Sequence, residues 1–199
     1  MTQNKHVDQS EQRQTLLRLD HSEGSCSHVI KNLWPLYQHD ISAFEGIAPN
    51  SHGLFANEEK MSTMDESVEG LGIWWQDKES LFPYLITTDG QPAGFNLIAA
   101  RSRLEGAIDA DFVVHEFFML HAYREKGVAE QAAIAGFNRH RGKWEVATWP
   151  NNARAISFWR RVIGRYSTNQ FSEVEKDHAW GRRRCFEFDN SALPPEESM

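Results

Sequence analysis

The sequence has little cysteine, with Cys26 and Cys185 as the two examples in 199 residues. They form no CxxC pair and have no spacing typical of metal ligands, which argues against a secreted disulfide scaffold and favours a reducing compartment. No apolar run approaches the roughly 18 residues that a membrane span needs. The first fourteen residues are almost all polar and lack the apolar segment of a signal peptide. We therefore expect a cytoplasmic protein that does not enter a membrane.

Positive charge is scarce in the chain as a whole, with 21 Lys and Arg residues against 28 Asp and Glu residues and a net charge of −7. A general binder of nucleic acid or of membrane surfaces would be basic, so we expect neither partner. The charge is unevenly distributed, because residues 124–165 hold nine Lys or Arg residues and three acidic residues, a local net charge of +6. A local site for an anion therefore stays open.

The aromatic content indicates a packed core, with seven Trp and twelve Phe residues in a chain that is 40% hydrophobic. A length near 200 residues predicts one domain. We place this domain at residues 15–190, between flexible tails at residues 1–14 and 191–199.

Hydrophobic periodicity predicts alternating strands and helices along most of the domain. The Asp89-Gly90 pair predicts a tight hairpin turn, and Pro35 predicts a kink in the first helix or its division into two. A strand–helix–strand order in the middle of the chain predicts a parallel pair inside a mixed sheet. In chain order, the expected elements are a strand at 15–20, a helix at 27–44, a hairpin of 83–88 and 93–100, a strand at 111–120, a helix at 127–140, a strand at 144–149, a helix at 152–163, and a hairpin of 166–174 and 179–188.

The segment from Arg124 to Ala129 carries the clearest chemical signal. It follows a strand and opens a helix, whose first turn offers unpaired N–H groups to an anion. Gly127 allows close backbone approach, while Arg124 and Lys126 add positive charge. The segment matches neither the Walker A motif nor the Rossmann fingerprint. It predicts either a cradle for a pyrophosphate or an ordinary helix start with solvated charges.

The residues around this segment resemble the GNAT superfamily of N-acetyltransferases. Residues 124–129 match the family's Arg/Gln-x-x-Gly-x-Gly/Ala motif, and Asn152–Ala155 match its later Asn-x-x-Ala motif, which Phe158-Trp159 follow. The run Gly142–Gly164 looks like one branch of predicted acetyltransferases. The resemblance covers about residues 111–164. It implies a single-domain α/β (α+β) fold with a mixed, mostly antiparallel sheet, a splayed central pair of parallel strands, and flanking helices.

The resemblance also implies acetyl-CoA as the cofactor, with its pantetheine arm between the splayed strands. In that arrangement the backbone of the first strand pairs with the pantetheine, the helix start binds the pyrophosphate, and the second helix contributes a contact near the pantetheine. The cofactor-binding residues implied are Phe118, Met119, Leu120, Arg124, Glu125, Lys126, Gly127, Val128, Ala129, Asn152 and Trp159.

Acetyl transfer to an amine requires removal of a proton, and Glu116 is our candidate for the catalytic base. Strand alternation places Glu116 with Phe118 on one face and His115 on the other, where His115 is an alternative base. A backbone N–H near Met119 or Leu120 would serve the oxyanion. The run HEFFMLH lacks the HExxH spacing, so we expect no metal site there.

Trp159 is a departure from the family, many of whose members carry at this position a Tyr that protonates the thiolate. An indole N–H donates hydrogen bonds but is not a usable acid. Two alternatives to an enzyme therefore stay open: a catalytically weak acyl-CoA-binding sensor with the same fold, and an interaction protein.

The acceptor expected from the resemblance is a primary amine on a small molecule or peptide. Residues 58–79 hold seven acidic residues and two lysines, which would attract a cationic amine or form an ordinary solvated loop. Trp74-Trp75 would line an acceptor pocket or cover the core. Dimers are common in the superfamily, so a homodimer is compatible with the resemblance.

Overall fold

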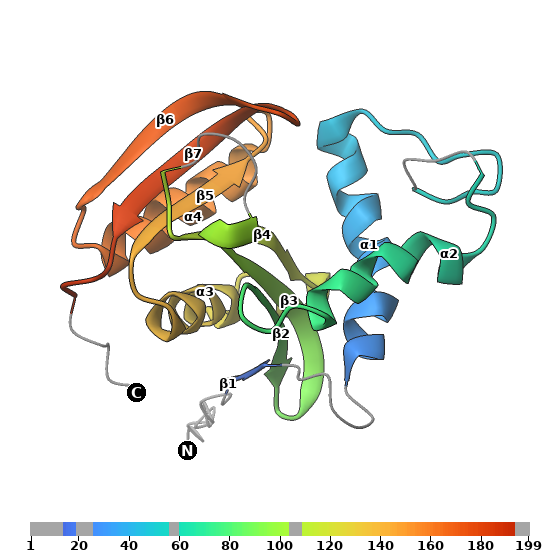
Figure 1. Ribbon diagram of the computed structural model, residues 1–199, viewed down its shortest axis with the longest axis horizontal. Coiled ribbons are helices and arrows are strands. Elements are labelled where there is room, and N and C mark those ends of the chain that lie inside the picture. The colour runs from blue at the N-terminus through green and yellow to red at the C-terminus, as the bar shows by residue number, and fades with distance from the viewer. Residues whose placement is uncertain (1–13, 19–25, 56–59, 104–108, 194–199) are drawn as a thin grey trace, which may run out of the picture.

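A computed structural model describes residues 14–18, 26–55, 60–103 and 109–193 (Figure 1). Over these residues, seven strands form one sheet in the order β1-β2-β3-β4-β5-β7-β6. The strands are β1 (Gln14–Arg18), β2 (Leu81–Thr88), β3 (Gln91–Ala100), β4 (Phe112–Met119), β5 (Lys143–Thr148), β6 (Phe171–His178) and β7 (Gly181–Asp189). The expected tails fall largely outside the described residues, and so do residues 19–20 of the first expected strand.

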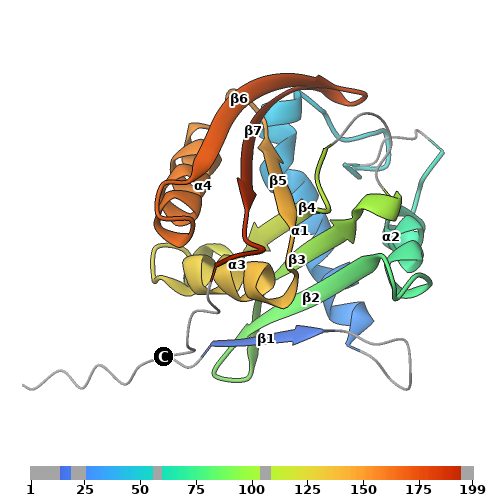
Figure 2. The same ribbon diagram turned by 60° about the vertical axis from the view of Figure 1, so that its left-hand side comes forward.

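The helices pack on both faces of this sheet (Figure 2). Helices α3 and α4 share one hydrophobic cluster with the sheet, while α1 and the first 3-10 helix share another on the opposite face. None of the helices in the described ranges is long and apolar enough to cross a lipid bilayer. The α-helices are α1 (Ser27–Glu45), α2 (Met64–Glu69), α3 (Val128–Arg139) and α4 (Ala153–Tyr166), and the 3-10 helices are η1 (Gly70–Trp75), η2 (Arg101–Arg103) and η3 (His121–Tyr123).

The hairpin of β2 and β3 confirms the prediction made from Asp89-Gly90, because both residues have positive φ angles, 51° and 75°. Helix α1 runs through Pro35 as one element, so its division into two helices is wrong. The buried stripe of Ile30, Leu33 and Tyr37 spans the proline and holds both halves against the sheet.

Two other boundaries differ from the sequence prediction. The last hairpin begins at Phe171 rather than at Tyr166, because α4 continues to Tyr166 and buries Val162, Ile163 and Tyr166. Residues 45–80, where the sequence predicted no helix or strand, contain α2, which begins with a capping box formed by Thr63 and Glu66. Glu66 therefore has a structural role in that acidic segment.

Strands β4 and β5 form the predicted parallel pair, while the other neighbouring strands are antiparallel. Their ladder contains three residue pairs and ends at Val114 and Val146. Strand β4 continues to Met119 along β3 alone. The two strands therefore part in the middle of the sheet, which agrees with the mixed, splayed architecture implied by the sequence.

A β-bulge interrupts β4 at His115. Leu97 pairs with Glu116 and Ile98 pairs with Val114, so His115 is the extra residue. Strict alternation would place His115 opposite to Glu116, and this expectation is wrong. The His115 ring instead contacts Trp74 at a centroid distance of 5.2 Å, and its Nδ1 lies 3.5 Å from Glu116 Oε1. Both side chains therefore lie on the face that α1 and η1 cover.

Gly94 generates a stability prediction, because a Cβ at this position would lie 2.0 Å from the Phe118 carbonyl oxygen. We expect Gly94→Ala to lower the free energy of unfolding by about 1–3 kcal/mol through overpacking. Gly70→Ala is the matched control, since its added Cβ meets nothing within 4 Å and its φ is −57°. Urea unfolding of both variants is the measurement, and equal stabilities would contradict the close approach of β3 and β4.

Candidate active site

A cavity of about 600 Å³ opens where β4 and β5 part. Its walls come from the end of β4, the last turns of α1, the start of α3 and the first turns of α4. Eight residues implied by the family resemblance line it: Phe118, Met119, Arg124, Glu125, Gly127, Ala129, Asn152 and Trp159. The segment of residues 124–129, which follows β4, and helix α4 thus line the same cavity, although about thirty residues separate them in the chain.

Leu120, Lys126 and Val128, which the resemblance also implied, are not among the lining residues of this cavity. Leu120 packs against the hydrophobic cluster that contains α1. Val128 is buried in the cluster that α3 and α4 share with the sheet, and Lys126 is exposed. Among these three, the backbone amides of Lys126 and Val128 stay candidates for anion binding because they lie at the start of a helix.

The end of β4 presents an open backbone edge at Met119. The Leu120 N–H donates to the Ala93 carbonyl at 2.8 Å, so this amide faces β3. Successive residues in a strand alternate their N–H and C=O directions, so the Met119 backbone faces away from β3. The Met119 carbonyl accepts from Arg124 Nε at 2.8 Å on that side. Met119 is therefore the better candidate for the oxyanion donor, and the Leu120 amide is excluded by its bond to Ala93.

Arg124 is anchored rather than free in the cavity. Besides Met119, its guanidinium donates to Asp40 Oδ2 of α1, and its Nη1 lies 3.1 Å from His121 Nε2. It also lies over the Phe118 ring at 5.8 Å. This side chain thus links α1 to the end of β4, which the sequence pattern did not indicate.

The loop between Arg124 and α3 has an unusual backbone. Glu125 and Gly127 both have positive φ, 64° and 77°, on either side of Lys126. A Cβ on Gly127 would meet Gln131 Nε2 at 4.0 Å and nothing nearer, so this backbone faces open space along the cavity wall. Helix α3 then begins at Val128, and its first N–H groups have no intrahelical acceptor. The loop has the form of an anion cradle.

Helix α4 supplies the opposite wall. Asn152 caps the helix by accepting from the Ala155 N–H at 3.0 Å, so its side-chain oxygen already has a structural partner. Arg154 and Arg161 also line the cavity, and the sequence motif did not single them out. Arg154 lies 3.3 Å from Glu125, and Arg161 lies 3.7 Å from Glu130. Two cations thus lie at this wall beside two carboxylates.

Trp159 belongs both to the core and to the cavity wall. Its side chain is 5% exposed and packs edge-on against Phe117 at 5.2 Å. It also lines the cavity. The hydroxyl of Tyr166 lies elsewhere, in a polar cluster where it donates to Asn138 and accepts from Asn190. Tyr166 therefore does not replace the acid that Trp159 lacks.

Glu116 lies on the α1 face of β4, two residues before Phe118, and is not among the residues that line the cavity. Tyr37 of α1 donates its hydroxyl hydrogen bond to Glu116 Oε2. The side chain is 23% exposed, and burial raises the pKa of Glu116 to about 8 against a smaller opposing effect of Arg183. Burial also lowers the pKa of the neighbouring His115. Glu116 is thus a carboxyl group with a pKa near neutrality.

The residues that α1 contributes were missed from the sequence. Tyr37 contacts Glu116, and one turn later Asp40 and Ile41 line the cavity together with Phe44. Helical spacing marks their positions, but no motif distinguishes them from other residues of an amphipathic helix.

The tandem tryptophans, Trp74 and Trp75, cover the core. They are 6% and 5% exposed and belong to the α1 cluster. Trp74 nevertheless contacts the ring of His115, which is the neighbour of Glu116 on β4.

No protein-family model matches the sequence, and no curated protein matches it. Among solved structures, the PaiA N-acetyltransferase from Thermoplasma acidophilum in complex with coenzyme A has a TM-score of 0.57 at 12% identity, over 89% of this chain and 99% of that chain. RimJ from Mycobacterium smegmatis in complex with CoA-disulfide has a TM-score of 0.56 at 15% identity, over 92% and 90% of the two chains. The chain has the fold of the GNAT acetyltransferases.

A third structure with the GNAT fold is the aminoglycoside acetyltransferase AAC(6')-Ib in complex with coenzyme A. It has a TM-score of 0.53 at 16% identity, over 91% of this chain and 97% of that chain. The expected fold class is therefore confirmed across nearly the whole chain, well beyond the segment at 111–164 that carries the sequence resemblance.

The raised pKa of Glu116 generates a prediction for stability. Its folded pKa of about 8 exceeds its ordinary value of 4.5, so folding favours the protonated form. The contribution of Glu116 to stability is then fully present below about pH 4.5, is lost progressively as the pH rises from 4.5 to about 8, and changes no further above that. We expect Glu116→Gln to gain stability relative to the wild type over this range, by at most about 1.4 kcal/mol per pH unit.

Urea unfolding of both proteins between pH 5 and 9 measures this difference. Glu125→Gln is the control, because Glu125 is exposed and lines the same cavity. A Glu116→Gln difference that does not change with pH would contradict the raised pKa.

Proposed function

We propose that the protein is an acetyl-CoA-dependent N-acetyltransferase that moves an acetyl group directly to a primary amine of a small molecule or peptide. The observation that carries the proposal is the cavity at the divergence of β4 and β5, between an open backbone edge at Met119 and the cradle at Gly127. The GNAT fold supports the same reaction, since the structures of PaiA, RimJ and AAC(6')-Ib were solved in complex with coenzyme A or CoA-disulfide.

The residues around the cavity fit coenzyme A. The pantetheine arm would lie along the end of β4, and the amides of residues 125–129 would hold the pyrophosphate. Arg154 and Arg161 add positive charge at the α4 wall. When bound, acetyl-CoA supplies an acetyl group that is activated as a thioester.

Glu116 would take the proton that an ammonium group must lose before its nitrogen can attack, either directly or through a water molecule. A pKa of about 8 gives Glu116 more basicity than an ordinary carboxylate. The Met119 N–H would donate to the carbonyl oxygen on which negative charge develops. Trp159 would pack against the thiol end of the cofactor without supplying a proton, and the acidity of the thiol would let the thiolate leave unaided.

The acceptor would approach on the α1 face, beside Glu116. Glu45 at the end of α1 is a second carboxyl group whose pKa is raised by burial, and Arg183 of β7 interacts with both. AAC(6')-Ib is by name an aminoglycoside acetyltransferase, so an amine on a small molecule fits this proposal. We also propose a cytoplasmic location, with a homodimer as one arrangement that fits the GNAT fold.

Trp159 favours a second candidate function, an acyl-CoA-binding sensor with weak catalysis. Both functions require cofactor binding, and they differ in turnover. Thiol release from acetyl-CoA across a panel of primary amines separates them, because a sensor would bind the cofactor and release no thiol above the background rate.

We expect Gly127→Val to weaken coenzyme A binding at least ten-fold, because the side chain would project into the cradle. Gly53→Val is the matched control, since Gly53 has a similar φ of 79°, has open space at its Cβ and does not line the cavity. Isothermal titration calorimetry measures both affinities. Equal affinities in the two variants would argue against the cradle.

We expect Glu116→Gln to lower kcat/KM by about 10²–10⁴-fold while leaving the affinity for coenzyme A unchanged. In the wild type, kcat/KM should rise with pH until Glu116 is ionised, near pH 8. The Gln variant should lose this rise, and Glu125→Gln should keep it. Thiol-release kinetics between pH 6 and 9 provide the profile, and an unchanged profile in the Gln variant would exclude Glu116 as the base.

A further inference from the structure

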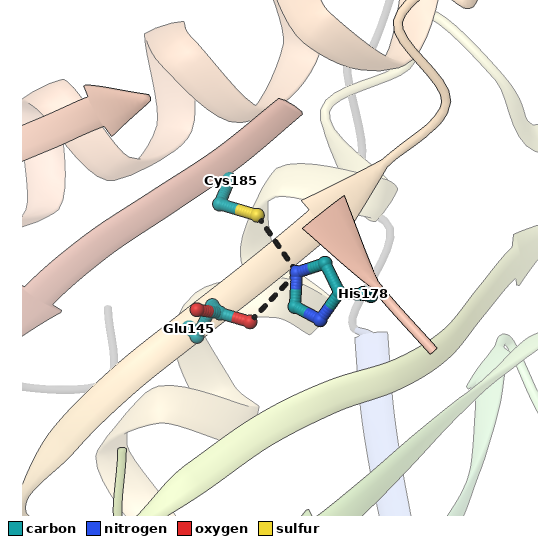
Figure 3. A group of neighbouring side chains, drawn as sticks. All are labelled: Glu145, His178 and Cys185. Atoms are coloured by element: carbon teal, nitrogen blue, oxygen red, sulfur yellow. Dashed lines mark hydrogen bonds and ion pairs between the residues drawn. The ribbon is translucent and has the colours of Figure 1, made fainter. Parts of the chain in front are cut away.

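Three side chains from different strands meet on the half of the sheet formed by β5, β7 and β6 (Figure 3). Glu145 comes from β5, His178 from the end of β6 and Cys185 from β7. Their side chains are almost fully buried, with exposures of 3% for Glu145, 6% for His178 and 0% for Cys185. None of the three lines the cavity described above.

The three polar atoms converge on one point. His178 Nε2 lies 3.2 Å from Cys185 Sγ and 3.5 Å from Glu145 Oε1, and all three ligand atoms lie within 4.8 Å of one another. Both contacts therefore use the same imidazole nitrogen, as the two dashed lines in Figure 3 show. A single N–H donates fully to one acceptor, so hydrogen bonding alone leaves this arrangement poorly satisfied.

This geometry differs from that of a catalytic Cys-His-Glu triad. In such a triad the nucleophile contacts one imidazole nitrogen, and the orienting carboxylate contacts the other. Here both contacts fall on Nε2. A cation between the three atoms would be contacted by all of them at once.

We propose that Glu145, His178 and Cys185 form a zinc site that ties β5, β6 and β7 together, with a water molecule as the fourth ligand. Thiolate, imidazole and carboxylate are the ligand types that Zn²⁺ prefers. Tetrahedral zinc with bonds of about 2.0–2.3 Å places neighbouring ligand atoms roughly 3.3–3.8 Å apart. The distances of 3.2 and 3.5 Å from Nε2 are close to this spacing.

Lys176 and Arg183 are neighbouring positive charges that oppose a cation, and Lys176 is in direct contact, with its Nζ 2.8 Å from Glu145 Oε2. Lys176 binds the carboxylate oxygen that points away from the cluster and leaves Oε1 directed at His178. Lys176 also pairs with Glu187, which compensates its charge. It thus holds Glu145 in the way that outer partners hold a ligating carboxylate.

The turn between β6 and β7 lies beside the cluster. The Trp180 ring stacks on the His178 ring at 4.9 Å and is 50% exposed. Thiolate is the form of cysteine that binds zinc, so zinc binding would release the thiol proton, and the bound state would pair one Zn²⁺ with two negative ligands.

The test uses the full chain, dialysed against a chelator under reducing conditions and titrated with Co²⁺ and then Zn²⁺. We expect one Co²⁺ per chain, with thiolate charge-transfer absorption and the visible bands of a tetrahedral ion, both abolished when Zn²⁺ displaces it. About one proton should be released per metal ion bound. Zn²⁺ should also raise the melting temperature.

Cys185→Ser should abolish the charge-transfer band, and His178→Gln should weaken Zn²⁺ binding at least ten-fold. Cys26→Ser and His121→Gln are the matched controls, because Cys26 and His121 are exposed, and both variants should bind as the wild type does. Melting curves without metal establish that each variant is folded. The proposal is wrong if the wild type gives no thiolate–cobalt band, if the band survives Cys185→Ser, or if Cys26→Ser removes it.

Discussion

The short parallel ladder between β4 and β5 is the constraint on which the rest of the candidate active site depends. It ends after three residue pairs, and β4 then runs on along β3 alone. A strand in the middle of a sheet normally has both edges paired, so the end of β4 exposes backbone groups that need another partner. Arg124 satisfies the Met119 carbonyl from within the chain. The gap itself is walled by α1 and α4, which leaves a cavity where a continuous sheet would leave none.

The bulge at His115 sets the chemistry beside this cavity. By adding one residue to β4, it brings His115 and Glu116 to the same face, against Trp74 and Tyr37. Burial disfavours the charged form of a carboxyl group, and one hydrogen bond from a tyrosine does not restore its hydration. Burial therefore destabilises the ionised form of Glu116 and raises its pKa, and the higher pKa makes its carboxylate a better base. Such a group is expected at a functional site rather than in a purely structural core.

Local sequence signals predicted the parts of the fold that depend on local physics. Asp89-Gly90 specified its turn because both residues adopt positive φ readily, and Gly127 marked the start of α3 for the same reason. The bulge at His115 was not predictable, because it arises from the pairing of β4 with β3. The contribution of Asp40 was hidden for a related reason, since its partner Arg124 lies 84 residues away. The zinc cluster has three ligands spread over 41 positions, too far apart for a spacing motif.

The uneven distribution of charge along the chain is related to the ion pairs at the wall of the cavity. Residues 124–165 carry a net charge of +6 in a chain of net charge −7. Within this segment Arg154 and Arg161, whose side chains are about half-exposed, pair with Glu125 and Glu130. Such pairs contribute little to stability, so an incoming phosphate can replace the carboxylates at small cost. The same carboxylates hold the guanidinium groups at the cavity wall beforehand, which reduces the entropy lost when an anion binds. The acidic residues of this segment thus position the positive charge that the proposed cofactor needs.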